Sequence, residues 1–308
     1  MISERIDAIT AIPREYMGTV VPPPRSVKIE ITADCNYHCA FCVKSLRPNN
    51  GQMDRALYSR LIRELRAAGV EELGLFYIGE SFTAKWLPEA IAEAKSVGFP
   101  YTFLTTNGAA APPARLKECF QAGLDSLKFS INFVDPDQLA SVANVAPKHW
   151  QKAIDNLKHA RTIRDGGKYP CGIYASSIAF DGDQGEAMRK VVDDIRPFVD
   201  EHYWLPLYGM GGASKAQGWK PQPGNPGRLG ALREPLPCWA VFTEGHITTD
   251  GLLAACCFGT GIEGDLIMAD LKTCTFMEGW NSQAFRELRG AHLARNVSGT
   301  ACAECAAG

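Results

Sequence analysis

Apolar and polar positions along the first two thirds of the chain predict strands and helices in alternation. Short apolar runs typical of buried strands are followed by stretches in which apolar residues recur at the spacing of an amphipathic helix. The predicted strands span 27–31, 73–78, 101–105, 126–131, 172–180 and 202–208, and the predicted helices span 54–68, 87–97, 113–122, 149–164 and 186–199. Six strand–helix units with short connections favour a parallel sheet covered by helices.

The pattern changes after about residue 209. The segment 209–230 is rich in glycine and proline, which predicts a loop or a junction between domains. Beyond it, 245–256 is predicted to form a two-stranded hairpin with Asp250 and Gly251 at its turn, because Asp-Gly is a favoured pair at tight hairpin turns. A further helix is predicted at 281–289.

Charge and composition narrow the class of protein. The chain has 308 residues, a formal net charge of −2 and no block of lysine and arginine, so a nucleic-acid partner is not expected. The N-terminus lacks the layout of a signal peptide, and no apolar run approaches the length that crosses a membrane. We therefore expect a cytoplasmic enzyme with no membrane partner. Seven of the eleven cysteines fall into two clusters with metal-ligand spacing, which favours a reducing compartment.

Three cysteines follow the first predicted strand at the spacing C-x3-C-x2-C. They are Cys35, Cys39 and Cys42, and thiolates this close together can reach one metal centre. Soft sulfur ligands suit an iron–sulfur cluster, and three ligands on a cluster of four irons leave one iron open to a substrate or cofactor. Zinc is the alternative, with His38 as the nearest fourth ligand.

A second cysteine set lies in the C-terminal region and consists of Cys238, Cys256, Cys302 and Cys305. Four cysteines that end in C-x2-C saturate one metal site, which is either an iron–sulfur cluster or a structural zinc ion. Cys257 adjoins a member of this set but exceeds the four-ligand count. Its thiol is either an inert buried group or a hydrogen-atom donor close to the metal.

The first cysteine spacing, with Phe41 directly before the third cysteine, resembles the signature of the radical S-adenosylmethionine (radical SAM) superfamily. The C-terminal pattern, with G-x4-C leading to Cys256, resembles the short twitch form of the SPASM domain. The resemblance implies an α/β fold, namely a partial (β/α)6 TIM-type barrel over 26–210, after an N-terminal extension (1–25) and before a linker and a small twitch/SPASM-like iron–sulfur domain (211–308). It also implies two [4Fe–4S] clusters, one that binds SAM and one auxiliary.

The resemblance further implies a SAM pocket at the strand ends. Tyr77, Gly79 and Glu80 are similar to the family's glycine–glutamate motif, whose backbone holds the SAM ammonium group, although a simple strand-to-helix turn has the same composition. The other implied pocket residues are Phe41 against the adenine, Thr106, Asn107, Ser130 and Asn132 toward the carboxylate and ribose, and Ser176 on the fifth strand.

Members of this superfamily cleave SAM to a 5′-deoxyadenosyl radical that removes a hydrogen atom from the substrate. The chain resembles twitch-domain enzymes of aminoglycoside biosynthesis, which implies epimerisation of an aminoglycoside or related carbohydrate with Cys257 as hydrogen-atom donor. Two alternatives are a dehydrogenase that uses the auxiliary cluster as electron acceptor and a peptide-modifying SPASM enzyme. The implied protein partner is a flavodoxin- or ferredoxin-type reductant. A plain iron–sulfur electron carrier has no use for six strand–helix units.

Overall fold

The computed structural model describes residues 1–46, 51–210, 213–228, 234–258 and 266–307. One nine-stranded sheet runs through these ranges in the order β6-β5-β4-β3-β2-β1-β7-β8-β9. The first six strands pair in parallel and are β1 Ser26–Ile29, β2 Glu72–Gly74, β3 Tyr101–Thr106, β4 Ser126–Ser130, β5 Gly172–Ile178 and β6 Glu201–Leu205. Each of these strands lies beside the next one along the chain, so the predicted partial (β/α)6 barrel is confirmed.

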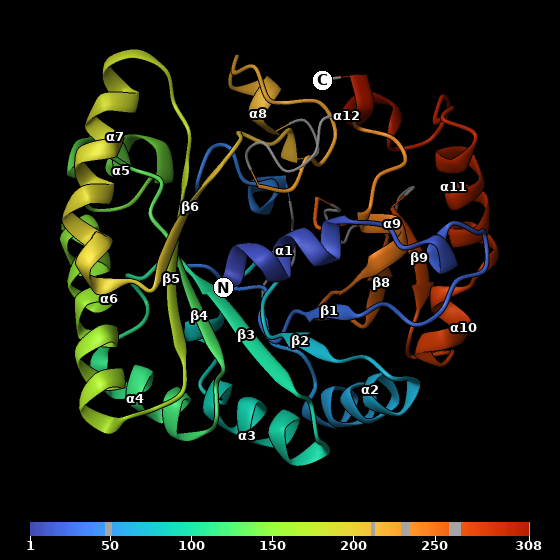
Figure 1. Cartoon of the computed structure of the whole chain (residues 1–308), viewed down its shortest axis with the longest axis horizontal. Coiled ribbons are helices and arrows are strands. Elements are labelled where there is room, and N and C mark those ends of the chain that lie inside the picture. The colour runs from blue at the N-terminus through green and yellow to red at the C-terminus, as the bar shows by residue number, and fades with distance from the viewer. Residues whose placement is uncertain (47–50, 211–212, 229–233, 259–265, 308) are drawn as a thin grey trace.

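Helices cover the outer face of the parallel strands, as Figure 1 shows. They are α2 Arg55–Ala68, α3 Leu87–Val97, α4 Pro113–Gln121, α5 Pro136–Ala143, α6 Lys148–Gly167 and α7 Gly182–Ile195. Local signals set their ends: the Asp54 carboxylate accepts a hydrogen bond from the Leu57 amide at 2.8 Å, and Gly69 ends the same helix at a φ of 104°. Within the described ranges, no helix is both long and apolar enough to cross a membrane.

Some elements differ from the sequence-based prediction. The second strand is shorter than 73–78, since β2 ends at Gly74 and only the Leu75 amide still reaches β3, at 3.0 Å from the Phe103 carbonyl. Strands β5 and β6 also end before 180 and 208. Helix α5 has no counterpart in the prediction, because it is a short helix inside a connection between a strand and a longer helix.

Side chains of the parallel strands alternate between the outer helices and the barrel interior. In β1, Val27 and Ile29 are fully buried in the main hydrophobic core, whereas Lys28 between them lines an interior cavity. In β4, Lys128 lines the same cavity and also stands between two buried apolar residues. A lysine in the middle of a buried strand therefore marks the inside of the barrel.

Three further strands extend the same sheet beyond β1. β7 (Glu244–Ile247) pairs in parallel with β1, and β8 (Leu252–Ala254) and β9 (Ile267–Asp270) follow in antiparallel pairing. The predicted hairpin is confirmed, with Gly251 at a φ of 78° in its turn. The helices of this region are α8 Ala213–Ala216, α9 Ala240–Thr243, α10 Phe276–Trp280, α11 Gln283–Leu293 and α12 Ala303–Ala307, of which α11 corresponds to the helix predicted at 281–289.

The N-terminal segment contains a helix, α1 (Ile2–Thr10), that lies between β6 and α9 (Figure 1). On one side, the Ser3 amide donates to the Glu201 carboxylate of β6 at 3.4 Å. On the other side, the Thr243 hydroxyl of α9 donates to the Ile9 carbonyl at 2.6 Å. The predicted N-terminal extension therefore bridges the last barrel strand and the C-terminal region.

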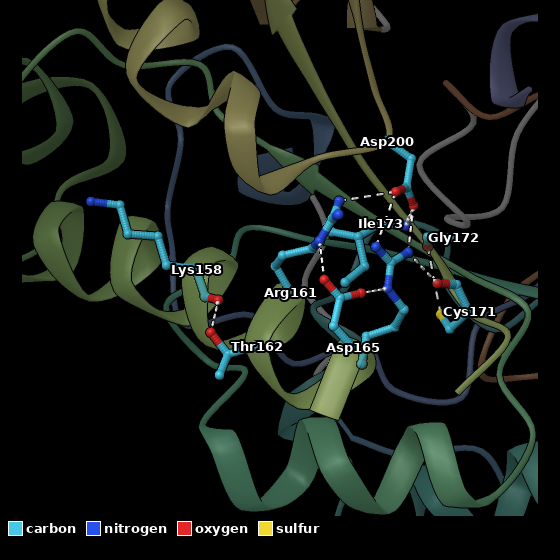
Figure 2. Close-up of polar contacts among 9 residues, drawn as sticks. Lys158, Arg161, Thr162, Asp165, Cys171, Gly172, Ile173 and Asp200 are labelled. Atoms are coloured by element: carbon cyan, nitrogen blue, oxygen red, sulfur yellow. Dashed lines mark hydrogen bonds and ion pairs between the residues drawn. The ribbon is translucent and has the colours of Figure 1, made fainter. Parts of the chain in front are cut away.

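Ion pairs join the end of α6 to Asp200, the residue before β6, and hydrogen bonds connect both to the start of β5 (Figure 2). Asp200 accepts hydrogen bonds from the Arg164 guanidinium at 2.7 Å and from the Ile173 amide at 2.8 Å. Arg164 also donates to the Cys171 carbonyl at 3.0 Å. Because these side chains are partly exposed, each ion pair contributes at most about 1 kcal/mol. Their main effect is to fix where the helix ends relative to the strand.

A buried carboxylate joins the barrel to the C-terminal hairpin. Glu30 directly follows β1 and is fully buried. Its Oε1 accepts hydrogen bonds from the amides of Ile78 and Gly79 at 3.2 and 3.1 Å, and its Oε2 accepts one from the Thr249 amide at 3.2 Å. Such donors offset the cost of burying a charge. Glu30 therefore holds the loop after β2 and the turn after β7 in one arrangement.

Glu30→Gln tests this contact. The NH2 group of glutamine meets a backbone N–H where a carboxylate oxygen stood, so a buried donor loses its acceptor. We expect the free energy of unfolding to fall by about 1–3 kcal/mol and amide hydrogen exchange to accelerate at Ile78, Gly79 and Thr249 together. Glu71→Gln, at an exposed carboxylate, is the control and should change stability by less than about 0.5 kcal/mol. Unchanged exchange at Thr249 in the Glu30 variant contradicts the assignment.

Candidate functional site

The three cysteines of the first set lie on the loop that leads from β1 toward α2. The Cys42 amide bonds the Cys39 carbonyl at 2.9 Å, so these two cysteines share one turn. Backbone amides also approach two of the sulfurs: Tyr37 N lies 3.4 Å from Cys35 Sγ, and Lys44 N lies 3.4 Å from Cys42 Sγ. Hydrogen bonds to sulfur favour the thiolate, which is the form that binds iron.

Helix α5 supports this loop from outside. The amides of His38 and Ala40 donate to the carbonyls of Ala143 and Val142 at 2.9 and 2.8 Å. These bonds fix the backbone between the first and third cysteines. The His38 side chain, which sequence analysis considered as a zinc ligand, is exposed to solvent.

The three thiols of this loop ionise readily only when a positive charge lies close to them. Burial raises the pKa of the Cys35 thiol to about 12, and nearby Glu80 and Cys42 add to this effect. Burial likewise raises the pKa of Cys39 and of Cys42. All three sulfurs become thiolates together only beside a compensating cation, and iron supplies that charge. The chemistry of this donor set therefore fits an iron–sulfur cluster.

The glycine of the predicted glycine–glutamate motif lies against the end of β1. A Cβ atom at Gly79 would stand 2.1 Å from the Thr32 carbonyl oxygen, so a larger residue requires the backbone to move. The next amide, that of Glu80, donates to the Asp34 carbonyl at 2.8 Å. This contact places the motif directly beside Cys35.

The Glu80 side chain is buried and points into the protein. Its carboxylate accepts hydrogen bonds from the Phe82 amide at 3.2 Å, the Thr106 hydroxyl at 2.9 Å and the Asn107 amide at 2.7 Å. Burial raises the pKa of Glu80 to about 6, against the lowering effect of these donors. The Asn107 side chain donates in turn to Asn36 of the cysteine loop at 2.7 Å. The carboxylate thus joins the motif to the end of β3, and Asn107 joins that end to the cysteines.

The other polar residues predicted for the SAM pocket gather at neighbouring strand ends. Asn107, Ser130 and Asn132 line one small cavity, together with Tyr37 of the cysteine loop. Ser176 stands opposite Ser130 in the register of β4 and β5. The structure therefore brings these residues of separate strands together.

Two aromatic residues predicted for the pocket take different places. Phe41, on the cysteine loop, lies near Phe133 and Trp219, with ring centroids 6.3 and 6.1 Å away. Tyr77 is directed toward the C-terminal region, where its hydroxyl donates to the Cys256 carbonyl at 2.9 Å. Tyr77 therefore connects the loop after β2 to the second cysteine set.

The cysteines of the second set line one cavity in the C-terminal region, and they are Cys238, Cys256, Cys302 and Cys305. None of them is in a disulfide. The Phe258 amide lies 3.1 Å from Cys256 Sγ, which again favours a thiolate. Four thiols around one space fit a fully ligated cluster. Across the described part of the chain, no three histidine, cysteine, aspartate or glutamate side chains form a group that holds a single metal ion.

One histidine that lines this cavity was not predicted from the sequence. His292, on α11, lines the cavity beside the four cysteines. Its Nδ1 accepts a hydrogen bond from the Cys238 amide at 3.1 Å, which places the ring proton on Nε2. Burial lowers the pKa of His292 to about 4, so the ring is neutral near pH 7. Helical periodicity marks the position as buried, but nothing in the sequence marks it as part of a metal site.

Another cavity, of about 200 Å3, lies inside the barrel and is closed on one side by α1; it is the interior cavity lined by Lys28 and Lys128. Cys257 lines this interior cavity, whereas its neighbour Cys256 lines the cavity of the second cysteine set. Asn225 and Phe258 line both spaces and therefore form part of the wall between them. The Asn225 side-chain nitrogen lies 3.6 Å from Cys257 Sγ.

Charged groups surround the Cys257 thiol. Lys28 forms an ion pair with Glu244 at 2.8 Å, and the same carboxylate lies 3.0 Å from Nε2 of His246. Hydrogen bonding from Cys256 is the largest cause that lowers the Cys257 pKa, and His246 and Lys28 lower it further. A Cys256 thiolate that binds iron has no proton to donate, so the largest contribution disappears when the cluster is present.

Two family models match the chain. The model of the radical SAM superfamily matches residues 29–173, and the model of SPASM, an iron–sulfur cluster-binding domain, matches residues 238–306. The first match contains the cysteine loop and the strand ends around it. The second match contains the cavity lined by four cysteines.

Curated relatives match over part of their length. The PqqA peptide cyclase of Xanthomonas oryzae pv. oryzae is 34% identical over 135 residues, which cover 42% of this chain and 36% of the relative. The GTP 3′,8-cyclase of Parasynechococcus marenigrum is 32% identical over 193 residues, which cover 60% of this chain and 52% of the relative. The chain thus spans only about a third to a half of the curated relatives it matches.

Solved structures share the fold over most of the chain. BtrN in complex with AdoMet and 2-DOIA has a TM-score of 0.59 at 15% identity and covers 92% of this chain and 91% of its own. Streptococcus suis SuiB bound to S-adenosylmethionine has a TM-score of 0.66 at 12% identity, with coverage of 88% and 69%. At these identities the likeness shows the fold alone. The two matches give the chain a radical SAM domain and an SPASM domain, and these domains imply SAM and [4Fe–4S] clusters, one of them auxiliary.

Proposed function

We propose that this chain is a radical SAM epimerase that inverts a carbon centre of an aminoglycoside or related carbohydrate, with Cys257 as the hydrogen-atom donor. The observation that carries the proposal is the position of the Cys257 thiol. It lines the interior cavity of the barrel, while the adjacent Cys256 lines the cavity of the second cysteine set. One thiol is therefore available to a substrate without leaving that set incomplete.

In this proposal the two cysteine sets hold the two clusters. The first set ligates the cluster that binds SAM and consists of Cys35, Cys39 and Cys42. The second set ligates the auxiliary cluster and consists of Cys238, Cys256, Cys302 and Cys305. Amides directed at the sulfurs of both sets support these roles, because they favour thiolates. The SAM pocket is formed by Phe41, Tyr77, Gly79, Glu80, Thr106, Asn107, Ser130, Asn132 and Ser176.

When bound, SAM and the reduced cluster supply a 5′-deoxyadenosyl radical that removes one hydrogen atom from a substrate carbon. Cys257 then gives the hydrogen atom of its S–H bond to the opposite face of that carbon, which forms a C–H bond and leaves a thiyl radical. One electron from a flavodoxin- or ferredoxin-type reductant and one proton restore the thiol. His246, buried beside Cys257 and hydrogen-bonded to Glu244, is positioned to supply that proton.

A dehydrogenase is the second candidate, and Lys128 favours it. Oxidation of a secondary alcohol requires a base near the carbon radical. Lys128 lines the interior cavity, and burial together with the neighbouring charge of Lys28 lowers its pKa to about 8. A peptide-modifying function draws support from the names of relatives, namely PqqA peptide cyclase and the SuiB structure bound to precursor peptide SuiA. The interior position of the cavity, behind α1, favours a small molecule instead.

The Cys257→Ala variant distinguishes the epimerase from the dehydrogenase. With a carbohydrate that supports SAM cleavage, we expect 5′-deoxyadenosine still to form while the epimerised product falls to background, because no other thiol of the described residues lines the cavity. In D2O the unmodified enzyme should place deuterium at the inverted carbon, since the thiol proton exchanges with solvent. Cys274→Ala is the matched control, because this cysteine lines neither cavity. Unchanged epimerisation in Cys257→Ala rejects the donor role, and a ketone product supports the dehydrogenase.

Iron content tests the ligand sets. Two clusters of four irons correspond to about eight irons per chain. Cys305→Ala should lose about four irons and keep an EPR signal that SAM perturbs, whereas Cys42→Ala should lose the SAM-sensitive signal. Cys119→Ala, a buried cysteine outside both sets, should keep the full iron content. Zinc in the C-terminal site of the unmodified protein would rule out an auxiliary cluster there.

A further inference from the structure

The charged side chains on the wall of the interior cavity are paired, with one exception among the described residues. The pairs are Arg5 with Glu72 at 2.7 Å, Lys28 with Glu244 at 2.8 Å and Arg228 with Asp7 at 2.6 Å. The exception is Lys128, which has no carboxylate partner in the described ranges. The wall therefore carries one positive charge in excess.

Lys128 stands in the middle of β4 and is directed to the interior. Its ammonium lies 5.8 Å from the centroid of the Tyr203 ring, a contact that supplies no negative charge to pair with the ammonium. Burial, and then the nearby charge of Lys28, lowers the pKa of Lys128 to about 8, and the opposing effects of Cys257 and Glu244 offset this lowering only in part. A buried ammonium without an anion costs free energy that a ligand can recover.

We propose that Lys128 binds an anionic group of the substrate, a carboxylate or a phosphate. Of the two substrate classes in the proposed function, this selects the related carbohydrates, as an acidic sugar-type molecule, over a polycationic aminoglycoside. This inference deepens the proposed function and rests on it in one respect: it takes the interior cavity as the substrate site. Cys257 lines the same cavity of about 200 Å3, so a small molecule held at Lys128 lies within the space that the thiol reaches.

The carboxylates of the wall argue against a cationic substrate. Glu72 already accepts from Arg5, and Glu244 is shared by Lys28 and His246. An ammonium group of a substrate therefore finds no unpaired carboxylate among the described wall residues, and it meets repulsion from Lys128. An anion is instead attracted, because it pairs with Lys128, the one cation among the described wall residues that lacks a carboxylate partner.

Binding without turnover tests the inference. The protein is reconstituted with iron and sulfide and supplied with SAM but no reductant, and ligand-observed NMR measures its affinity for D-glucuronate, D-glucose 6-phosphate and D-glucosamine. We expect at least one of the two anions to bind about tenfold or more tightly than glucosamine. The glucuronate and phosphate arms distinguish a carboxylate from a phosphate ligand. Lys128→Met should abolish this preference, and Lys128→Arg, which keeps the charge, should retain it.

The controls make each result decisive. Lys152→Met is the same change at an exposed lysine of α6 and should leave the anion preference unchanged. Lys128→Gln replaces the methionine variant if iron content shows that methionine disrupts the protein. Equal binding of glucosamine, no binding of either anion, or a preference that survives loss of the Lys128 charge overturns the inference. Cys257→Ala should keep the preference, so epimerisation that survives in that variant rejects the proposed function and leaves the anion site standing.

Discussion

The buried carboxylate of Glu30 is the contact that fixes the loop beside the first cysteine set relative to the hairpin that leads to the second. An ionised carboxylate inside a protein is costly unless it is hydrogen-bonded, and Glu30 has three backbone donors from two segments that lie far apart in sequence. It follows β1, which pairs with β2 on one side and with β7 on the other. The loop beside the first cysteine set and the hairpin that leads to the second are thus fixed to one point of one sheet.

Because the hairpin belongs to the same sheet as the barrel strands, one chain segment contributes residues to the walls of two cavities. The hairpin leaves the sheet at β8 and delivers two adjacent cysteines to the boundary between the barrel interior and the C-terminal region. Cys256 lines one space and Cys257 the other, with Phe258 on the wall between them. Tyr77 secures the boundary from the barrel side, because its hydroxyl bonds the Cys256 carbonyl. The Cys257 thiol beside the interior cavity therefore lies next to a member of the second cysteine set because the two residues are consecutive in the chain.

Local signals in the sequence predicted the parallel sheet with its helices and the cysteine sets, and the family resemblance implied the barrel. Long-range contacts were not predicted. Helix α2 begins at an aspartate cap and ends at a glycine, so residues next to the helix determine both of its ends. The pairing of β7 with β1 and the contact between Glu30 and Thr249 join residues separated by more than two hundred positions, which no periodicity indicates. One local signal was nevertheless present: Lys28 and Lys128 interrupt apolar strands, and a lysine there indicates an interior that holds something polar.

How much the relatives indicate about the substrate depends on which parts of the chain form the cavity wall. The radical SAM match spans 29–173, which contains the cysteine loop and Lys128, but the wall also draws on Arg5 from α1, Tyr203 from β6 and Asn225. The matched part contains the first cysteine set, and segments outside the match close the interior cavity. Relatives named for peptide or nucleotide substrates share identity with only part of this chain. The proposed substrate charge therefore rests on the wall itself, where Lys128 has no carboxylate partner among the described residues.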